Sequence, residues 1–205
     1  MAAFKLYGDP ISGNCLKVKW TADFLELDYE WVETDILDKK TRTNEFLNLN
    51  PFGQAPCIVF EDGRALSQSN AIVLHLAEEA GERLLPDDPY QRSLVQQWLF
   101  WEQNSHEPYI AGRRFRKAYL NARDDEIDAE WLPRGLAALS RLEQALTDTP
   151  YLVAGRLTAA DICLVAYTRV APEGGFDLGE FERIRAWLAR VEDDLGVTPE
   201  GAWSH

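Results

Sequence analysis

The spacing of hydrophobic residues changes repeatedly over the first 80 positions, which is typical of mixed α/β structure. Some short stretches alternate between apolar and polar residues like strands. In others, apolar residues recur every three or four positions, as they do on one face of a helix. The expected order is a strand at 4–7, a helix capped by Ser12, a strand at 29–32, a short helix at 43–49, hairpin strands at 57–60 and 64–66, and a helix from 69 to 80.

The second half of the chain shows helical spacing only. Residues 81–90 contain a Pro-Asp-Asp-Pro segment that predicts a linker, so we expect an α/β domain at 1–80 and an all-helical domain at 91–205. Pro108 should kink or end the first long helix. Further helices are expected around 132–146, at 162–167 and at 181–191. The segment 162–167 is apolar on all sides, which predicts a central position.

Acidic residues outnumber basic ones, 34 to 21, and the formal net charge is -13. Such a chain repels phosphate backbones and anionic lipid, which argues against nucleic-acid and membrane partners. The longest uninterrupted apolar run, 162–167, is far shorter than the ~20 residues that cross a bilayer, and the start shows no secretion signal. Three scattered cysteines suit a reducing compartment, so we expect a cytoplasmic protein without a disulfide framework or a metal cluster.

Four short motifs lie in order along the chain, each beside a predicted element. They are Ser12-Gly13-Asn14-Cys15 after the first strand, Asn50-Pro51-Phe52-Gly53-Gln54-Ala55-Pro56 before the third, Gln68-Ser69-Asn70-Ala71-Ile72 at the third helix, and Thr158-Ala159-Ala160-Asp161 at the central helix. The chain thereby resembles the soluble glutathione S-transferases, and looks like a bacterial or plant-type member of the theta or phi sort that uses serine. The resemblance implies a thioredoxin-like N-terminal domain, an all-α C-terminal domain, glutathione as co-substrate, a homodimer and a role in detoxification.

Glutathione chemistry requires a thiolate, because a thiol with a pKa near ~8.5 is only slightly ionised at pH 7. The hydroxyl of Ser12 can donate to the sulfur, and the adjacent helix N-terminus favours the same negative charge. Taken alone, Ser12 would more simply be a helix cap. Some bacterial, Nu-like relatives use an asparagine two residues beyond a Ser or Thr as the thiol-contacting donor, so Asn14 is the second catalytic candidate. Cys15 occupies an apolar helix position and is expected in the core.

The resemblance also assigns residues to the rest of glutathione. Pro56 resembles a cis-proline that exposes the backbone of Ala55, which would pair with the cysteinyl amide as an added strand, with Gln54 beside it. The alternative for Pro56 is a trans proline that starts an edge strand. Ser69, at a helix N-terminus, suits the γ-glutamyl carboxylate. Arg42 stands where a His-Lys pair often clamps the glycine carboxylate, and a solvated surface arginine is the alternative.

Gln68 departs from the family, which commonly has a glutamate at this position to meet the ammonium group of the ligand. Glutathione binding would then be weaker, or a partner subunit would supply an acidic side chain. Glu102 is a candidate for that borrowed acid.

The helical half offers aromatic candidates for the pocket of the electrophile: Tyr109, Phe115, Tyr119 and Trp203. Each could equally belong to the core or the surface. His106 is expected to pack against a neighbour rather than act on substrate. Thr158 and Asp161 are expected to cap the central helix by bonding two of its N–H groups that lack helical partners.

Together these residues predict a transferase that conjugates the glutathione thiolate to small apolar electrophiles without a metal or a prosthetic group. Within the same fold, glutathione-dependent reduction of peroxides or disulfides is the nearest alternative, and it is favoured if Asn14 is the main thiol contact. A non-catalytic protein that keeps this fold for binding or assembly is the alternative from another class. The combination of Ser12, Pro56 and Ser69 argues against that alternative, whereas Gln68 slightly favours it.

Overall fold

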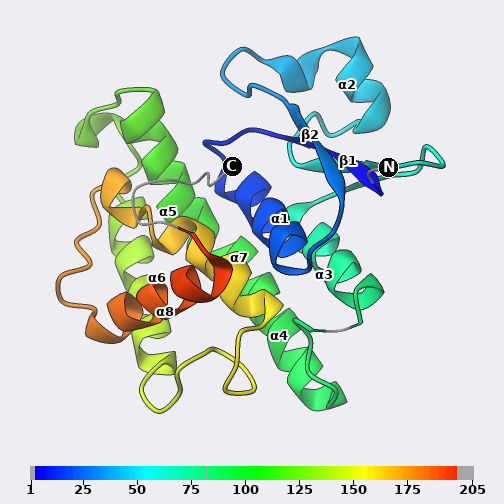
Figure 1. Ribbon diagram of the computed structural model, residues 1–205. Helices are drawn as coiled ribbons and strands as arrows, with labels where there is room; N and C mark the ends of the chain where they lie inside the picture. Colours follow the sequence, from blue (N-terminus) through cyan, green and yellow to red (C-terminus); the bar gives the residue numbers. More distant parts are fainter. Residues whose placement is uncertain (1–2, 82, 198–205) are drawn as a thin grey trace. The chain divides into compact units, whose positions relative to one another are not determined.

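A computed structural model describes residues 3–81 and 83–197 of the chain. The described chain divides into two compact units. The first runs to Leu85 and includes the described residues from Leu195 onward, and the second spans Pro86–Asp194. Within the described residues, all the strands lie in the first unit and the second unit is helical (Figure 1).

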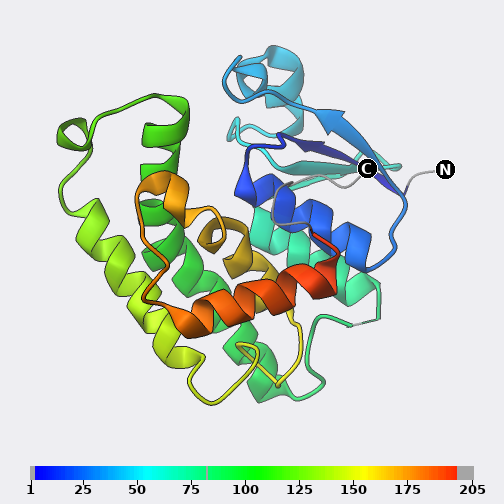
Figure 2. The same ribbon diagram turned by 60° about the vertical axis from the view of Figure 1, so that its left-hand side comes forward.

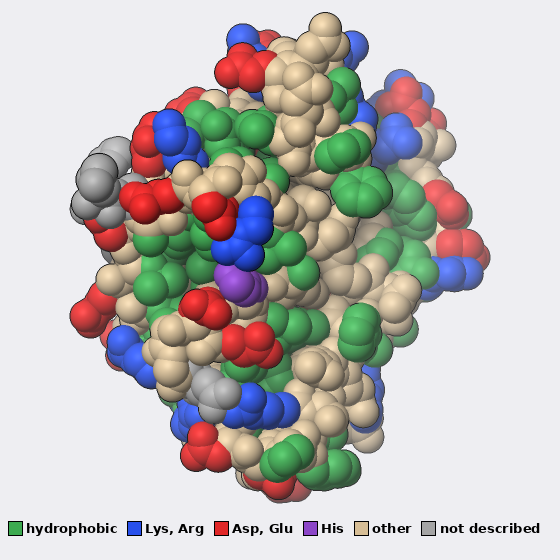
Figure 3. All heavy atoms as spheres, turned by 90° about the vertical axis from the view of Figure 1, so that its right-hand side faces the viewer, with side chains coloured by type: hydrophobic (Ala, Val, Ile, Leu, Met, Phe, Trp, Pro, Cys, Tyr) green, Lys and Arg blue, Asp and Glu red, His purple; other side chains and the backbone are tan. Residues whose placement is uncertain are grey.

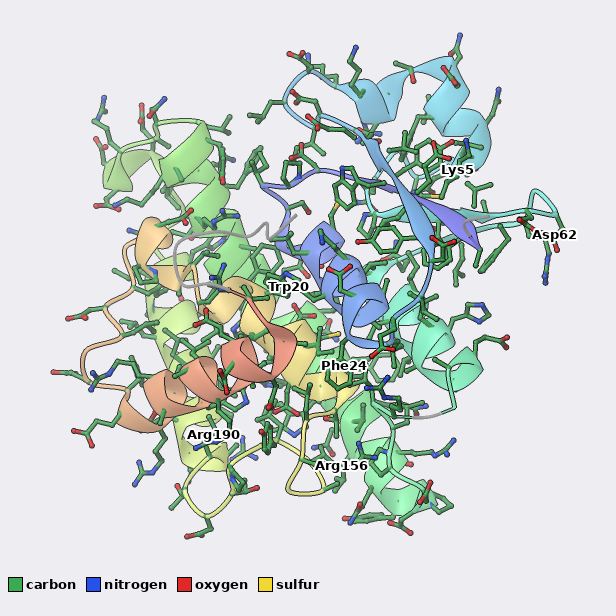
Figure 4. All side chains as sticks on the ribbon, in the orientation of Figure 1. Lys5, Trp20, Phe24, Asp62, Arg156 and Arg190 are labelled. Carbon is green, nitrogen blue, oxygen red and sulfur yellow. The ribbon has the colours of Figure 1, made fainter. Side chains whose placement is uncertain are left out.

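The first unit is built on a four-stranded sheet with the strand order β2-β1-β3-β4. The strands are β1 (Phe4–Gly8), β2 (Tyr29–Glu33), β3 (Cys57–Phe60) and β4 (Ala65–Ser67). β1 pairs in parallel with β2 and antiparallel with β3, and β3 pairs antiparallel with β4. The parallel pair requires a crossover connection, which the helix α1 (Gly13–Phe24) provides, whereas β3 and β4 form a hairpin. At its tip the carboxylate of Asp62, labelled in Figure 4, accepts from Arg64 at 2.6 Å.

Helices cover both faces of this sheet, as the alternation along β1 requires. Phe4 and Leu6 are buried, and Tyr7, which points to the opposite face, meets Phe46 of α2 (Asn44–Leu49) edge-on at 6.2 Å between ring centroids. α1 packs against α3 (Ser69–Glu79), and both views show these two helices on the face opposite α2 (Figures 1 and 2). The first unit is therefore the thioredoxin-like domain that the motifs predict.

The second unit is a bundle around one apolar helix. Its α-helices are α4 (Pro89–Trp101), α5 (Glu107–Arg114), α6 (Trp131–Ala145), α7 (Ala159–Thr168) and α8 (Glu182–Leu195). Every residue of α7 is buried, and α7 contacts both α4 and α5 (Figure 2). A helix that is apolar on all sides has no face for solvent, so this central position confirms the prediction from its sequence.

Two π-helical turns interrupt the longest helical stretch of the second unit. The turn η2 (Glu102–His106) separates α4 from α5, and η3 (Phe115–Tyr119) follows α5. Pro108 occupies the first turn of α5. Because proline cannot donate a backbone hydrogen bond, the regular helix breaks just before it, as predicted.

The linker predicted at 81–90 is too long at its C-terminal end. α4 begins at Pro89, and the side chain of Asp88 caps it by accepting from the N–H of Gln91 at 2.9 Å. Leu84 and Leu85 are buried. A proline in the first turn of a helix costs no hydrogen bond, so Pro89 starts the helix instead of ending the linker.

Charges of both signs lie on the surface of the protein. On the face shown in Figure 3, acidic and basic side chains are interspersed rather than gathered into areas of one sign. Across β1 and β2, for example, Lys5 pairs with Glu30 at 3.2 Å. Among the residues that the structure describes, no helix combines the length and the apolar character needed to span a membrane.

Candidate functional site

The candidate site begins in the loop that leads into α1, and the carboxylate of Asp9 shapes this loop. Asp9 is only 4% exposed, and its two oxygens accept from the N–H groups of Ile11 at 3.0 Å and Ile36 at 2.8 Å. The N–H of Ser12 donates to the carbonyl of Asp9 at 3.1 Å. Asp9 therefore holds Ser12 at the first turn of α1. Sequence reasoning missed this role, because Ile36 is distant in the chain.

Ser12 is the N-cap of α1, but its hydroxyl is only loosely engaged there. The oxygen accepts from the N–H of Cys15 at 3.4 Å, which is long beside the usual value of about 2.9–3.0 Å. The cap uses the oxygen as an acceptor and does not itself consume the hydroxyl proton. Ser12 can therefore cap α1 through its oxygen and still donate its proton to a ligand.

Cys15 belongs to the core of the first unit, as predicted. Its side chain has no exposed surface, and burial raises the pKa of the Cys15 thiol from 9.0 to about 11, against the lowering effect of the hydrogen bond with Ser12. A thiol with so high a pKa carries almost no thiolate at neutral pH. Cys15 is therefore not the nucleophile of this site.

Asn14 joins the start of α1 to the start of α3. Its Oδ1 atom accepts from the hydroxyl of Ser69 at 2.9 Å and from the ammonium of Lys17 at 2.8 Å. Asn14 is half-buried, whereas Ser69 is buried and is the first residue of α3. The structure thus brings two predicted site residues from distant motifs into direct contact.

Gln68 precedes α3 in an unusual backbone conformation. Its φ and ψ are 72° and 109°, and its side chain makes no capping bond to α3. A non-glycine residue held in such a sparsely populated region costs about 1–3 kcal/mol, and residues of this kind concentrate at functional sites. Gln68, the residue immediately before α3, is exposed.

The loop before β3 presents the third part of the site. The peptide bond between Ala55 and Pro56 is cis, as predicted, and Pro56 is buried. Asn50, which is 2% exposed, braces this loop because its Nδ2 donates to the carbonyl of Gln54 at 2.6 Å and its Oδ1 accepts from the N–H of Phe52 at 3.2 Å. The sequence showed Asn50 only as the first residue of the motif before the third strand, without this bracing role.

Arg42 lies against the same loop. It ends the short 3-10 helix η1 (Lys40–Arg42), it is exposed, and its Nη1 is 3.5 Å from the carbonyl of Phe52. Gly53 makes this approach possible, since a Cβ atom there would lie 2.5 Å from the same Nη1 and its φ is +62°. The guanidinium therefore stands beside the loop that carries Ala55.

The aromatic candidates of the second unit have polar atoms that are already engaged. The hydroxyl of Tyr109 accepts from Arg134 at 3.0 Å, and that of Tyr119 accepts from Arg114 at 2.7 Å. Phe115 stacks on Tyr119 with ring centroids 5.9 Å apart and is 36% exposed. The structure thus pairs Phe115 with Tyr119. Trp203 lies outside the described residues.

Two other residues of the second unit are buried in its interior. His106 has no exposed surface, and its Nε2 lies 2.9 Å from the hydroxyl of Thr168, which confirms that it packs against a neighbour. Glu102 also has no exposed surface and accepts from Gln103 at 2.8 Å. The expectation that Glu102 serves a partner subunit is therefore wrong, because a fully buried carboxylate cannot reach another chain.

The predicted cap of α7 is present and extensive. The carboxylate of Asp161 accepts from the N–H of Thr158 at 3.0 Å and from its hydroxyl at 2.9 Å. It also accepts from the N–H of Leu152 and from the indole of Trp187, both at 2.9 Å. Burial raises the pKa of Asp161, and these hydrogen bonds act in the opposite direction. The cap is structural and joins α7 to α8.

Among the described residues, no group of three or more His, Cys, Asp or Glu side chains is arranged to hold a metal ion. The polar atoms at the starts of α1 and α3 and in the loop before β3 are instead hydroxyl, amide and backbone groups, with an arginine beside them. Such groups suit a small organic ligand with ionised ends.

A thioredoxin-like domain with these polar groups, followed by a helical domain, defines the architecture of glutathione S-transferases. Residues 11–79 match the family model of the glutathione S-transferase N-terminal domain, and residues 103–194 match that of the C-terminal domain. The chain belongs to the glutathione S-transferase family, which confirms the family predicted from the motifs.

Solved structures of bacterial relatives share this fold. The crystal structure of a glutathione S-transferase from Pseudomonas fluorescens Pf-5 is 46% identical with a TM-score of 0.89, and the match covers 93% of this chain and 95% of that one. A second, from Xanthobacter autotrophicus Py2, is 43% identical with a TM-score of 0.86, and 92% of each chain is covered. Glutathione S-transferase F14 of Arabidopsis thaliana is 35% identical over 146 residues, which are 66% of this chain but only 56% of the plant protein.

Proposed function

We propose that this protein binds glutathione along its first unit, holds the sulfur as a thiolate with Ser12 and Asn14, and conjugates it to small apolar electrophiles. The observation that carries the proposal is the hydrogen bond between Asn14 and Ser69, 2.9 Å long, which joins the starts of α1 and α3 in one polar site. Both helix starts favour an anion, so one ligand could place its thiolate at α1 and its carboxylate at α3.

The energy required for thiolate formation is within reach of these groups. Lowering the pKa of a thiol from ~8.5 to ~6.5 requires about 2.7 kcal/mol of preferential stabilisation of the charged form. A hydroxyl donated to the sulfur contributes about 1.5–3 kcal/mol, and a helix N-terminus adds about 0.3–1 kcal/mol. With glutathione bound, Ser12 would donate its hydroxyl proton to the ligand's sulfur, since its cap bond uses only the oxygen.

The remaining contacts follow from an extended tripeptide. The backbone of Ala55, the residue before the cis bond to Pro56, would pair with the cysteinyl amide, and Gln54 would support that contact. Arg42, with its side chain exposed beside the same loop, would bind the glycine carboxylate through its planar fork. At the other end, Gln68 and the backbone N–H of Ser69 would bind the γ-glutamyl group.

We assign the electrophile to the helical unit. Phe115 and Tyr119 offer a stacked aromatic pair, and the hydroxyl of Tyr119 is already bonded to Arg114. Such a pair favours an apolar or aromatic substrate over a polar one. Tyr109 is the other aromatic candidate, and both tyrosine rings carry a guanidinium, at 5.5 Å over Tyr109 and 5.1 Å over Tyr119.

The experiment is a paired test of binding and turnover. Wild type should be retained on immobilised glutathione and should conjugate chlorodinitrobenzene, whereas Ser12→Ala should bind glutathione with little turnover. Retention without turnover of any electrophile, peroxide or mixed disulfide would favour a non-catalytic binding protein. Turnover that survives in Ser12→Ala and is lost in Asn14→Ala would transfer the catalytic role to Asn14.

A second activity is favoured by the way Asn14 is held. Asn14 is held by Ser69 and Lys17, and if it is the main thiol contact, glutathione-dependent disulfide reduction becomes the favoured activity. In that reaction the thiolate attacks a disulfide, one sulfur leaves as a thiolate, and a second glutathione resolves the mixed disulfide. Assaying a mixed disulfide and a peroxide beside chlorodinitrobenzene would rank the activities.

We also propose that the protein forms a homodimer. Phe52, in the loop before β3, is 65% exposed, which is unusual for so large an apolar side chain, and a second subunit would cover it. Sedimentation should show a dimer of the 23.3 kDa chain in wild type and a larger monomer fraction in Phe52→Ser. A monomeric wild type would contradict this assignment and leave the catalytic proposal intact.

A further inference from the structure

The most unusual charged group of the first unit is the ammonium of Lys17. Lys17 has no exposed surface, although lysine is among the residue types that are least often fully buried. It lies on α1 one turn after Asn14, and its Nζ is 2.8 Å from Oδ1 of Asn14 and 3.5 Å from Oδ1 of Asn70. Burying an ammonium costs several kcal/mol before its hydrogen bonds are counted. Such a group at a candidate site suggests a role beyond packing.

The chemistry of Lys17 determines which way the amide of Asn14 points. An ammonium group can only donate hydrogen bonds, so the atom of Asn14 that faces it must be the carbonyl oxygen. The hydroxyl of Ser69 reaches this same oxygen and acts as a second donor, at 2.9 Å. With the nitrogen in that place, the amide would point its own protons at the ammonium.

The same arrangement restricts Ser69. A serine hydroxyl has one proton, and in this network the proton goes to Asn14. Toward a ligand, Ser69 can then offer its oxygen lone pairs and its backbone N–H. A ligand carboxylate that takes the hydroxyl proton would do so at the expense of Asn14, and Lys17 would remain to hold the amide.

We infer that Lys17 is a positioning residue that holds Oδ1 of Asn14 toward the protein interior and thereby turns Nδ2 of Asn14 toward the sulfur of glutathione. This step rests on the proposed function. Toward the ligand, Asn14 then acts as an N–H donor, and Lys17 is the group that enforces this orientation. Lys17 itself does not touch the substrate.

The first test compares Lys17→Met with Lys19→Met. Lys19 lies on the same helix, is 8% exposed, and donates to Asp23 at 2.6 Å, so its replacement removes a buried lysine without touching Asn14. The readout is the ultraviolet titration of the sulfur in bound glutathione. It is combined with kcat and KM for glutathione and for chlorodinitrobenzene. Lys17→Met should raise the pKa of bound sulfur by about one unit and lower kcat about tenfold at pH 6.5.

If Lys17 were merely structural, its replacement would lower the amount of active protein and leave the pH dependence of sulfur ionisation and of kcat unchanged. The proposal therefore requires that the profile of Lys17→Met moves to higher pH and that Lys19→Met keeps the wild-type profile. Lys17→Arg, which also donates only, should restore most of the shift. A profile of Lys17→Met that coincides with that of Lys19→Met would overturn the inference.

A second variant covers the case in which Lys17→Met does not fold. Asn14→Asp keeps the shape of the side chain and an oxygen for Lys17 and Ser69, but it removes the Nδ2 donor. Its bound sulfur should titrate at higher pH than in wild type, and turnover should fall at least tenfold. Bound sulfur as acidic as in wild type would exclude Asn14 as a donor and overturn the inference. If wild type neither binds glutathione nor lowers the pKa of its sulfur, the proposed function itself fails.

Discussion

The starts of α1 and α7 have the same kind of sequence signature but are satisfied to very different extents. At α7, the carboxylate of Asp161 accepts from four donors at 2.9–3.0 Å, and both Asp161 and Thr158 have no exposed surface. At α1, the hydroxyl of Ser12 accepts from the N–H of Cys15 at 3.4 Å and is partly exposed. The capping carboxylate at α7 is thus fully engaged within the protein, whereas the capping hydroxyl at α1 keeps hydrogen-bonding capacity.

This difference shows that a helix start with a hydroxyl cap can serve either stability or ligand binding. A buried helix start must satisfy its N–H groups within the protein, because each unsatisfied group costs about 1–3 kcal/mol. A helix start at a ligand site can leave part of that task to the ligand, whose anion then gains the interaction. The start of α3 resembles that of α1 in this respect, since Gln68 makes no side-chain cap.

The strongest test of this comparison removes the saturated cap. Asp161→Ala leaves the buried donors of Leu152, Thr158 and Trp187 without their acceptor and should lower the free energy of unfolding by about 4 kcal/mol. Asp148→Ala, at an exposed aspartate, should change it by less than about 0.5 kcal/mol. Urea denaturation measures both. A loss as small as that of the control would mean that the Asp161 network contributes little.

Ser12→Ala should have a small effect on stability and a large effect on turnover, the reverse of Asp161→Ala. The long cap bond predicts a loss of less than about 1 kcal/mol in unfolding free energy, whereas kcat/KM with chlorodinitrobenzene should fall roughly 100-fold as the sulfur loses its donor. Asp88→Ala, which removes the 2.9 Å cap of α4, should cost about 1 kcal/mol in stability without changing turnover. Equal effects of the two variants on turnover would refute the distinction.

Cys15 provides a pH test of the first turn of α1. Because burial raises the pKa of Cys15 to about 11 in the folded protein, the thiol favours folding fully below its ordinary pKa of 9.0. This contribution is lost as pH rises toward 11, and it amounts to about 3 kcal/mol. Cys15→Ala should therefore show a smaller fall in unfolding free energy between these pH values than wild type. Alkylation of native Cys15 by iodoacetamide at pH 8 would contradict this burial.

The smallest expected effect is at Gln68. Gln68→Gly relieves the unfavourable backbone conformation and should stabilise the protein by about 1 kcal/mol while it weakens glutathione binding. Gln68→Glu keeps the backbone strain, so its thermal midpoint should match wild type, and its charge should tighten binding of the ligand's ammonium group. Thermal melts with and without glutathione give both quantities. A Gln68→Gly variant that binds as well as wild type would remove Gln68 from the site.

Local spacing accounts for the parts of this protein that were predicted correctly. Apolar periodicity, turn residues and capping residues act over a few positions, so the order of strands and helices, the central α7 and the cap at Thr158 could be read directly. The start of α4 was misplaced because Pro89 can end a linker or begin a helix with equal ease. The two π-helical turns leave no distinct local pattern apart from Pro108.

By itself, the sequence determined the family, the thioredoxin-like half and the helical half, and it predicted most residues of the candidate site. Only the tertiary structure decided how those residues meet. Asn14 and Ser69 are 55 positions apart, and Lys17 and Asn70 are 53 apart, so no local pattern shows that they share a hydrogen-bond network. The network exists because α1 and α3 pack on each other, and such long-range packing depends on the whole domain rather than on neighbours in the chain.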